Sequence, residues 1–288
     1  MPAISLVVCL YQEGDLLKRL LEQAQDCFDD LVVVHDGPDT TQVRAVVEAA
    51  GGRFFECPRE YQQEPHWPFA WGVAKHDWIL RLDADEAPSP ALREWLVQFR
   101  SAPEPPVDLS GYTCIWPFWN GKRPVTKYWP DDRNFLFHRH RVRFFGMVEQ
   151  VPVADGRWEP LKLVLEHQPQ RPSYGLHYAL FRKHAANWRT RIATSLLLDS
   201  PSELPHGRWD NLPWPVTWQR IRERPLREAV VRMTVWFVRG LRLQWKKEGR
   251  PMPLVALTWS LMHAQICLKH WRLRRAGAMY HRPSEPPA

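Results

Sequence analysis

The chain has 288 residues, and with 44% hydrophobic residues it can build a core, which excludes a wholly disordered protein. Its length allows one large domain, or one domain with an appendage. The net charge of +7 is unevenly spread, because residues 1–130 carry a net −7 and residues 131–288 a net +14. This asymmetry predicts that the second half meets something anionic, with a merely solvated basic surface as the alternative.

Five cysteines are scattered along the chain, and no spacing among them is typical of a zinc site or a disulfide framework. A reducing, cytoplasmic setting fits them best. The sequence passes from Met1 straight into a strand-like run without a basic leader, so we expect no signal peptide. The longest apolar stretch, 254–268, is too short to span a membrane and contains His263 and Gln265.

Short apolar runs alternate with amphipathic segments through the first hundred residues. The apolar runs predict buried strands over 4–10, 31–34, 53–57 and 78–82. The amphipathic segments predict helices over 15–24, 41–50, 69–75 and 90–99. This alternation predicts a parallel α/β sheet, in which ligands bind beyond the carboxyl ends of the strands.

The pattern changes after residue 100. Further strands are predicted over 112–118, 134–137 and 161–166, and they extend the same sheet as a mixed one. Beyond them we expect one long helix over 173–198 and two more helices near 225–247 and 253–275.

Acidic side chains follow two of the predicted strands. The triplet Asp83-Ala84-Asp85 comes directly after the run 78–82, and Asp36 follows the run 31–34. Mg²⁺ and Mn²⁺ prefer carboxylate oxygens, and two carboxylates one residue apart at a turn can converge on one metal and a ribose. A metal held there could stabilise the charge that grows on a phosphate leaving group. The alternative is a solvated turn after a strand.

The stretch 77–86 resembles the family 2 glycosyltransferases, and among them the lipopolysaccharide-core β-1,4-glucosyltransferase-like proteins. Other segments line up in order with that family, namely 4–13, 34–37, 131–137, 148–151, 163–167 and 236–250. The resemblance implies a GT-A fold, an α/β architecture with a mixed, mainly parallel sheet flanked by helices. It implies a glycosyltransferase domain over 1–198, with a nucleotide-binding half (1–100) and an acceptor half (101–198). A Trp- and Pro-rich loop and basic helices follow over 199–288.

The same resemblance implies a donor site for a nucleotide-sugar, with a UDP-sugar as the expected donor. The candidate donor-contacting residues are Leu10, Gln12, Glu13, Asp36, Asp83, Ala84 and Asp85. Asp36 is expected to contact the base. Asp85 is expected to bind a divalent metal, Mn or Mg, directly, while Asp83 contacts the ribose or has an outer role at the metal. His167 could complete the metal site, and a structural histidine is the alternative.

The resemblance also implies an inverting reaction, which needs a general base to take the proton of the acceptor hydroxyl. Glu149 is the first candidate, because 148–151 resembles a His-Glu-x-Val motif of the family. Asp131 is the second candidate, with Asp132 beside it; the alternative for Glu149 is a surface carboxylate. The aromatic segment 116–119 could form a wall for the acceptor sugar or pack in the core.

The C-terminal helices combine basic and aromatic residues. The sequence places Arg232, Arg239, Arg242 and Lys246 on one helical face, near Trp236. This pattern predicts peripheral contact with an anionic membrane, at the inner face of the cytoplasmic membrane. The alternative is a pair of helices packed on the catalytic domain with a basic outer face.

These observations favour an inverting, metal-dependent glycosyltransferase that transfers sugar to a cell-surface glycan or a lipid-linked acceptor. A sugar-nucleotidyltransferase is a second possibility, but such an enzyme normally has a Gly-rich basic loop after its first strand, and residues 11–14 do not form one. A third possibility is a non-catalytic basic homologue that binds membrane or nucleic acid. It leaves the paired strand-end carboxylates unexplained, so we expect no nucleic-acid partner.

Overall fold

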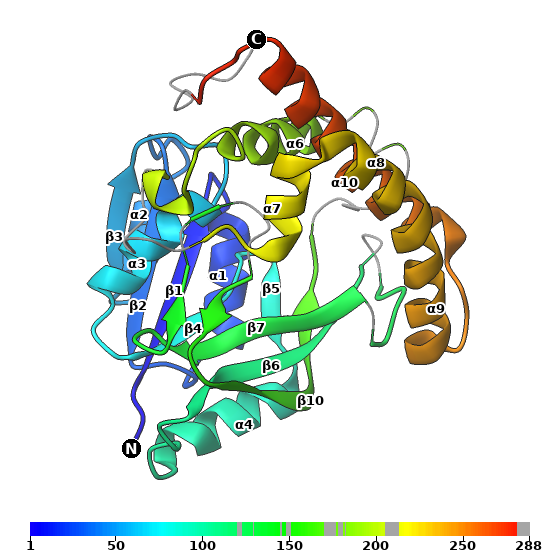
Figure 1. Ribbon diagram of the computed structural model, residues 1–288. Coiled ribbons are helices and arrows are strands. Elements are labelled where there is room, and N and C mark those ends of the chain that lie inside the picture. Colours follow the sequence, from blue (N-terminus) through cyan, green and yellow to red (C-terminus); the bar gives the residue numbers. More distant parts are fainter. Residues whose placement is uncertain are drawn as a thin grey trace. The chain divides into compact units, whose positions relative to one another are not determined.

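The computed structural model describes residues 1–119, 123–128, 130–144, 146–147, 151–169, 177, 181, 183–204 and 213–280. The chain forms two compact units (Figure 1). The first comprises residues 1–144 and 150–171, and the second comprises 145–149 and 172–288. The predicted boundary at residue 198 stays a prediction.

The first unit is built on an eight-stranded sheet with the order β3-β2-β1-β4-β7-β6-β10-β5. Four neighbouring strands are parallel, namely β3 (Arg53–Cys57), β2 (Asp30–Asp36), β1 (Ile4–Leu10) and β4 (Trp78–Arg81). The sheet continues through β7 (Pro130–His138), β6 (Leu109–Pro117), β10 (Arg157–His167) and β5 (Glu86–Pro88). Strand β7 is antiparallel to β4 and β6, β10 is parallel to β6, and β5 is antiparallel to β10. The predicted mixed, mainly parallel sheet is confirmed, and a separate small pair joins β8 (Val142–Arg143) to β9 (Val153–Ala154).

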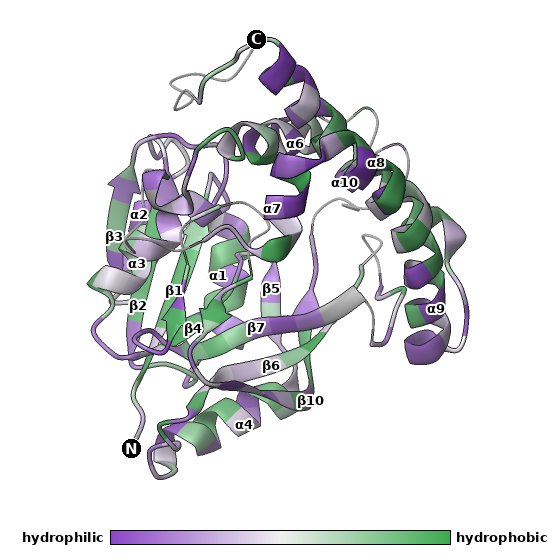
Figure 2. Ribbon diagram, in the orientation of Figure 1, coloured by the Kyte–Doolittle hydropathy of each residue, from purple (hydrophilic) through white to green (hydrophobic). Residues whose placement is uncertain are grey.

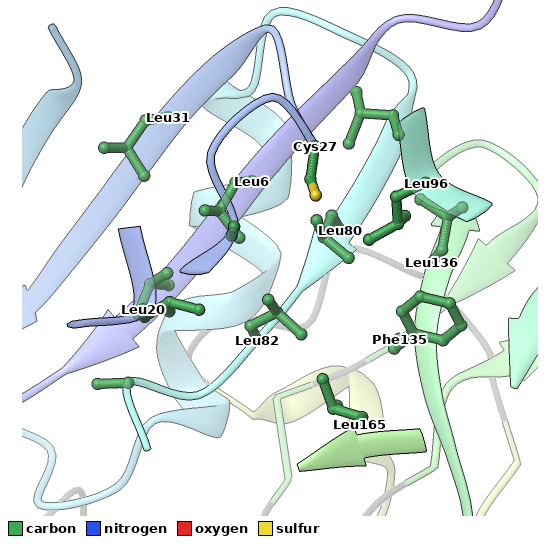
Figure 3. Packing of buried hydrophobic residues seen from close by; sticks show 14 of the residues in the cluster. Leu6, Leu20, Cys27, Leu31, Leu80, Leu82, Leu96, Phe135, Leu136 and Leu165 are labelled. Carbon is green, nitrogen blue, oxygen red and sulfur yellow. The ribbon is translucent and has the colours of Figure 1, made fainter. Parts of the chain in front are cut away.

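Helices cover both faces of this sheet. Alternate residues of β1 point to a core shared with α1 (Gly14–Gln23), α2 (Val43–Ala49) and α4 (Pro90–Ser101). Figure 3 shows this packing, in which Leu6 and Leu80 of the strands lie among Leu20, Leu96 and Phe135. The opposite face carries the short helix η1 (Glu64–His66) and α3 (Trp67–Val73), with Trp71 against Phe137 and Phe144. The parallel strands β1 and β4 are correspondingly hydrophobic (Figure 2).

An ion-pair cluster ties together the amino ends of the central strands, away from the acidic triplet. Asp30 on β2 is buried, and its two carboxylate oxygens accept hydrogen bonds from Nη2 of Arg53 at 2.9 and 2.7 Å, while Nε of Arg53 donates to Oδ1 at 3.3 Å. It also accepts hydrogen bonds from Oγ of Ser5 at 2.8 Å and from the amide of Lys75 at 3.0 Å. Burial alone would raise the pKa of Asp30, but these hydrogen bonds outweigh it and hold the pKa below its usual range.

The second unit is helical in its described part. It contains α6 (Lys183–Ser195), η2 (Pro201–Glu203), α7 (Val216–Glu223), α8 (Pro225–Val231), the π-helical turn η3 (Arg232–Trp236), α9 (Phe237–Glu248) and α10 (Pro253–Arg275). Its core is formed mainly by aromatic and aliphatic side chains such as Trp188, Ile192, Trp218 and Ile266. Within the range 173–198, where one long helix is predicted, the structure describes α6 over Lys183–Ser195, so the helix ends three residues before the predicted end.

The structure corrects one detail of the predicted basic helical face. Arg232 is only 2% exposed, with Nη2 lying 3.7 Å from Oε2 of Glu228 and its guanidinium 3.9 Å from the Trp236 ring centroid. The π-helical turn widens the helix at this point and turns Arg232 inward, whereas Arg239 and Arg242 stay exposed. Within the described ranges, no helix has the length and apolar character needed to cross a membrane.

Candidate functional site

The acidic triplet lies where the chain leaves the sheet after β4. The amide of Leu82 still donates to the carbonyl of Val7 on β1 at 3.3 Å, and the amide of Glu86 donates back to the carbonyl of Asp83 at 3.0 Å. The side chains of Asp83 and Asp85 stay partly exposed, at 24% and 22%. Both carboxylates therefore lie at the carboxyl edge of the parallel strands, where ligands of such sheets bind.

A buried ion-pair network holds Asp83. Arg133, from β7, donates from Nη2 to Oδ2 of Asp83 at 2.7 Å, and its Nε lies 3.2 Å from Oε1 of Glu86. Glu86 is 1% exposed and also accepts hydrogen bonds from the amide of Asp83 at 2.8 Å and from Nε1 of Trp116 at 2.7 Å. One guanidinium group thus serves two carboxyl groups, with a short charge-assisted hydrogen bond to Asp83 and a longer one, at 3.4 Å, to Oε2 of Glu86.

Burial shapes the electrostatics of this network. It raises the pKa of Glu86 to about 7, since the ionised carboxylate loses its solvation and the charge of Arg133 offsets only part of the loss. Burial acts to lower the pKa of Arg133, but the charges of Asp83 and Glu86 outweigh it and raise this pKa above its usual range. A permanent positive charge therefore lies beside the acidic triplet.

His167 is brought to Asp85 by the pairing of β10 with β5. In that register His167 lies opposite Glu86, and the amide of Gln168 donates to the carbonyl of Asp85 at 2.8 Å. Nε2 of His167 lies 3.4 Å from Oδ2 of Asp85. The imidazole stacks on Trp116, with ring centroids 4.2 Å apart and planes 21° from parallel. Two residues 82 positions apart in sequence thus share one site.

The loop after β1 reaches the same edge of the sheet. Gln12 adopts a left-handed backbone conformation, with φ of 57°, and its amide donates to Nε2 of His35 at 3.2 Å. Nδ1 of His35 lies 2.6 Å from the carbonyl of Gly37, so His35 donates there and joins the loops that follow β1 and β2. Burial, and then the charges of Asp85 and Asp83, raise the pKa of Glu13 to about 7. Glu13 therefore lies within the electrostatic reach of the acidic triplet.

Asp36, the predicted base contact, is already engaged within the protein. Its carboxylate accepts hydrogen bonds from Nη1 of Arg59 at 2.9 Å and from the amide of Glu60, and lies 2.9 Å from Nε2 of His66. The Arg59 guanidinium also lies over the ring of Tyr11, 3.2 Å from its centroid. Contact between Asp36 and a nucleotide base stays a prediction, and these partners fix the direction in which the carboxylate points.

The remaining predicted residues have simple placements. Leu10 is fully buried and Ala84 is 2% exposed, and both belong to the core, so their backbones are the parts that could meet a donor. Asp131 belongs to β7, but its side chain lies outside the described residues. Glu149 lies outside them altogether.

Comparison with known proteins bears on this site. The sequence model of the family described as Glycosyl transferase family 2 matches residues 5–156, more than half of the chain. The chain belongs to this family. The match includes the loops after β1 and β2, the acidic triplet and Arg133, and the sheet architecture above is the GT-A fold of a glycosyltransferase.

Solved structures that resemble this glycosyltransferase share little sequence with it. The mannosyltransferase PcManGT from Pyrobaculum calidifontis, in complex with GDP-Man and Mn²⁺, has 15% identity and a TM-score of 0.45, covering 95% of this chain and 87% of its own. TarS 1–349 from S. aureus has 12% identity and a TM-score of 0.39, covering 97% and 93%. A mycobacterial protein has 17% identity and a TM-score of 0.44, covering 68% and 74%.

The residues of the site fit a divalent cation that is shared with a ligand. In the part of the chain that the structure describes, no three His, Cys, Asp or Glu side chains are arranged to hold an ion by themselves. Asp85 and His167 nevertheless present an oxygen and a nitrogen 3.4 Å apart, and Oδ1 of Asp83 is buried without a hydrogen-bond partner. Mg²⁺ is commonly bound through one or two carboxylates, with phosphate oxygens of the substrate completing the shell.

Sequence reasoning missed the residues that organise this site. Arg133, Glu86 and Arg59 were not among the candidates, and Trp116 was considered only as an acceptor wall or a core residue. Each of the four acts through a partner that is distant in sequence. The hydrogen bonds Arg59–Asp36, Trp116–Glu86 and Arg133–Asp83 join residues that are 23, 30 and 50 positions apart. The arginine directly before the predicted strand 134–137 is a signal that could have indicated a nearby carboxylate.

Proposed function

We propose that this glycosyltransferase catalyses an inverting, metal-dependent transfer from a nucleotide-sugar, with a UDP-sugar as the expected donor. The observation that supports this most is the convergence of Asp85 with His167 beside Asp83, at the carboxyl edge of the sheet. If the acidic triplet were only a solvated turn, there would be no reason for His167 of β10 to be stacked on Trp116 and held next to the Asp85 carboxylate. A divalent cation bound there would offset the negative charge that develops on the leaving diphosphate.

The other side chains prepare the site for this role. Arg133 fixes Asp83 on one side, which leaves Oδ1 of Asp83 for a ribose hydroxyl or a water at the metal. Trp116 holds the imidazole plane of His167 by stacking while its Nε1 is tied to Glu86. Such supporting contacts keep metal ligands in a productive orientation before any ligand arrives.

The general base is proposed from the family resemblance. Glu149 remains the first candidate and Asp131 the second, because an inverting transfer needs a carboxylate that takes the acceptor proton as the hydroxyl oxygen attacks the anomeric carbon. Two single variants, Glu149→Gln and Asp131→Asn, separate the two assignments. The variant that lacks the base should lose transfer while it still binds the donor diphosphate.

Calorimetry with UDP and Mn²⁺ tests the donor proposal. We expect wild-type protein to bind UDP much more tightly with Mn²⁺ than without it, and Asp85→Ala to lose that dependence. Asp77→Ala is the matched control, since Asp77 precedes β4 at the other end of the same strand and pairs there with Arg139. GDP is titrated as well, so that a different base preference is recognised. Wild-type protein that binds neither diphosphate, or binds equally without metal, would contradict the proposal.

We propose further that the acceptor is a cell-surface glycan or a lipid-linked sugar, reached by peripheral contact with the inner face of the cytoplasmic membrane. One exposed face of η3 and α9 supports this. Its centre carries the cations Arg239, Arg242 and Lys246, and its margins carry exposed apolar side chains, namely Val235, Trp236, Val238, Leu243 and Trp245. Cations flanked by tryptophan and aliphatic side chains are typical of helices that lie in an anionic membrane interface.

Vesicle flotation tests this membrane proposal. We expect the full-length protein to float with vesicles that contain phosphatidylglycerol and to stay at the bottom of the gradient with phosphatidylcholine alone. The double variant Arg239→Glu/Arg242→Glu should lose flotation, whereas Lys18→Glu/Arg44→Glu, which changes the net charge equally on the first unit, should keep it. Equal flotation of both double variants would overturn the assignment of this face.

A further inference from the structure

Arg81 is a buried cation that has no hydrogen-bond or ion-pair partner for its side chain among the residues that the structure describes. It is the last residue of β4, two positions before Asp83, and only 7% of its surface is exposed. Its Nε is completely buried and has no hydrogen-bond partner, and the guanidinium makes no ion pair with any residue that the structure describes. The guanidinium lies 4.8 Å from the ring centroid of Trp67.

This isolation is unusual within the described residues. The other buried arginine, Arg232, has Glu228 on the preceding helical turn, 3.7 Å away. Arg133, near Arg81, pairs with both Asp83 and Glu86, whereas Arg81 forms no ion pair with either of them and is attracted by these carboxylates, and by Glu64, only from a greater distance. Burial, and then the repulsion of Arg133, lower the pKa of Arg81 to about 10, so it stays protonated at neutral pH. A buried charge without a counter-ion is unfavourable unless the folded protein gains something from it.

The place of Arg81 indicates what the counter-ion is. Side chains alternate along a strand, and Leu80 and Leu82 point to the core. Arg81 therefore points to the opposite face, and Asp83 follows it two residues later at the carboxyl edge, where ligands of parallel sheets bind. An anion that reaches this edge meets the acidic triplet as well, so a ligand that carries both negative charge and a divalent metal suits the site. A guanidinium group binds phosphate oxygens through paired N–H donors.

We infer that Arg81 binds the diphosphate of the nucleotide-sugar donor, opposite the metal side of Asp85 and His167. This inference rests on the proposed function, because that function supplies the diphosphate. Arg81 then neutralises the negative charge of the diphosphate that the metal leaves uncompensated. The diphosphate in turn supplies the counter-ion that Arg81 lacks in the ligand-free protein. Arg81 consequently favours donor binding but lowers the stability of the ligand-free protein.

The variant Arg81→Met tests this inference, because methionine fills a similar volume without charge. UDP, or GDP if UDP does not bind, is titrated with Mn²⁺ into wild type and variants. Inorganic pyrophosphate serves as a probe without a base. We expect Arg81→Met to weaken diphosphate binding by about 10-fold to 100-fold, the range for hydrogen bonds to a charged group. The melting temperature of the ligand-free variant should equal or exceed that of wild type, and Arg81→Lys should bind with intermediate affinity.

The control and the remaining outcomes separate the two proposals. Arg44→Met removes one positive charge from an exposed position on α2 and should leave diphosphate affinity unchanged. Wild type that binds none of the probes contradicts the proposed function itself. Wild type that binds while Arg81→Met binds equally well overturns only the role of Arg81. A ligand-free Arg81→Met protein that melts well below wild type also overturns it, because that behaviour belongs to a structural residue.

Discussion

Replacing Arg133 by methionine is the most informative perturbation of the site. The substitution leaves Glu86, which is 1% exposed, without a cation, while methionine occupies much of the vacated volume. Removing one partner of a buried ion pair costs about 3–5 kcal/mol. Two hydrogen bonds to Glu86 persist, from the amide of Asp83 and from Nε1 of Trp116, so we expect the lower end of that range, about 3 kcal/mol.

The chain has two compact units, so the melting temperature is a better measure than a single unfolding free energy. A loss of about 3 kcal/mol corresponds to a decrease of roughly 6–12 °C for a unit of this size. The double variant Arg133→Met/Glu86→Gln tests the reason. Since glutamine removes the stranded charge and keeps the shape, it should recover more than half of the lost stability, as in a double-mutant cycle. Arg133→Met melting close to wild type, or a double variant no better than the single one, would refute this reasoning.

Three further outcomes follow from the same contacts. Trp116→Leu removes the surface on which His167 stacks, so Mn²⁺ affinity measured by calorimetry should fall by about 10-fold, as for other residues that orient metal ligands, with a smaller loss for Trp116→Phe. Because the pKa of Glu13 is raised to about 7, Mn²⁺ affinity of wild type should increase from pH 6 to pH 8 as this carboxyl ionises, and Glu13→Gln should show a smaller increase. The pKa of Asp30 is depressed, so its stabilisation is present above its ordinary pKa of 3.8 and is lost as pH falls. Asp30→Asn should therefore melt below wild type at pH 7, and the gap should close below about pH 4 in melts from pH 7 to pH 3; a constant gap would contradict this.

The parallel half of the fold was predictable because its strands are apolar runs with no competing interpretation. The run 4–10 forms β1 over the same residues, and every residue of β2 is buried as a central strand requires. The position of the acidic triplet after β4 followed from the same pattern. Strand-end placement is a local property, so it can be inferred from one stretch of sequence.

The organisation of the site was not predictable, because it depends on contacts between distant segments. Nothing in residues 86–88 indicates a strand, and β5 forms only because β10 supplies its hydrogen-bonding partner. Arg232 illustrates the same limit in the second unit. Helical periodicity places it with Arg239 and Arg242, but the π-helical turn changes the periodicity and buries it.

The irregular pairing of β10 determines more than the shape of the sheet. Between its contacts with Thr113 and Ile115 of β6, the three residues 161–163 span a distance that Cys114 alone spans on β6. Side chains alternate between the two faces of a strand. Deleting one of the three residues would therefore place a residue next to His167 in sequence, and not His167, opposite Asp85, whereas deleting two would return His167 to the face that it now occupies. The identity of the side chain that faces Asp85 is thus encoded partly in the length of this segment. Chains of this fold could gain or lose the imidazole by a change in length, with no substitution at the histidine itself.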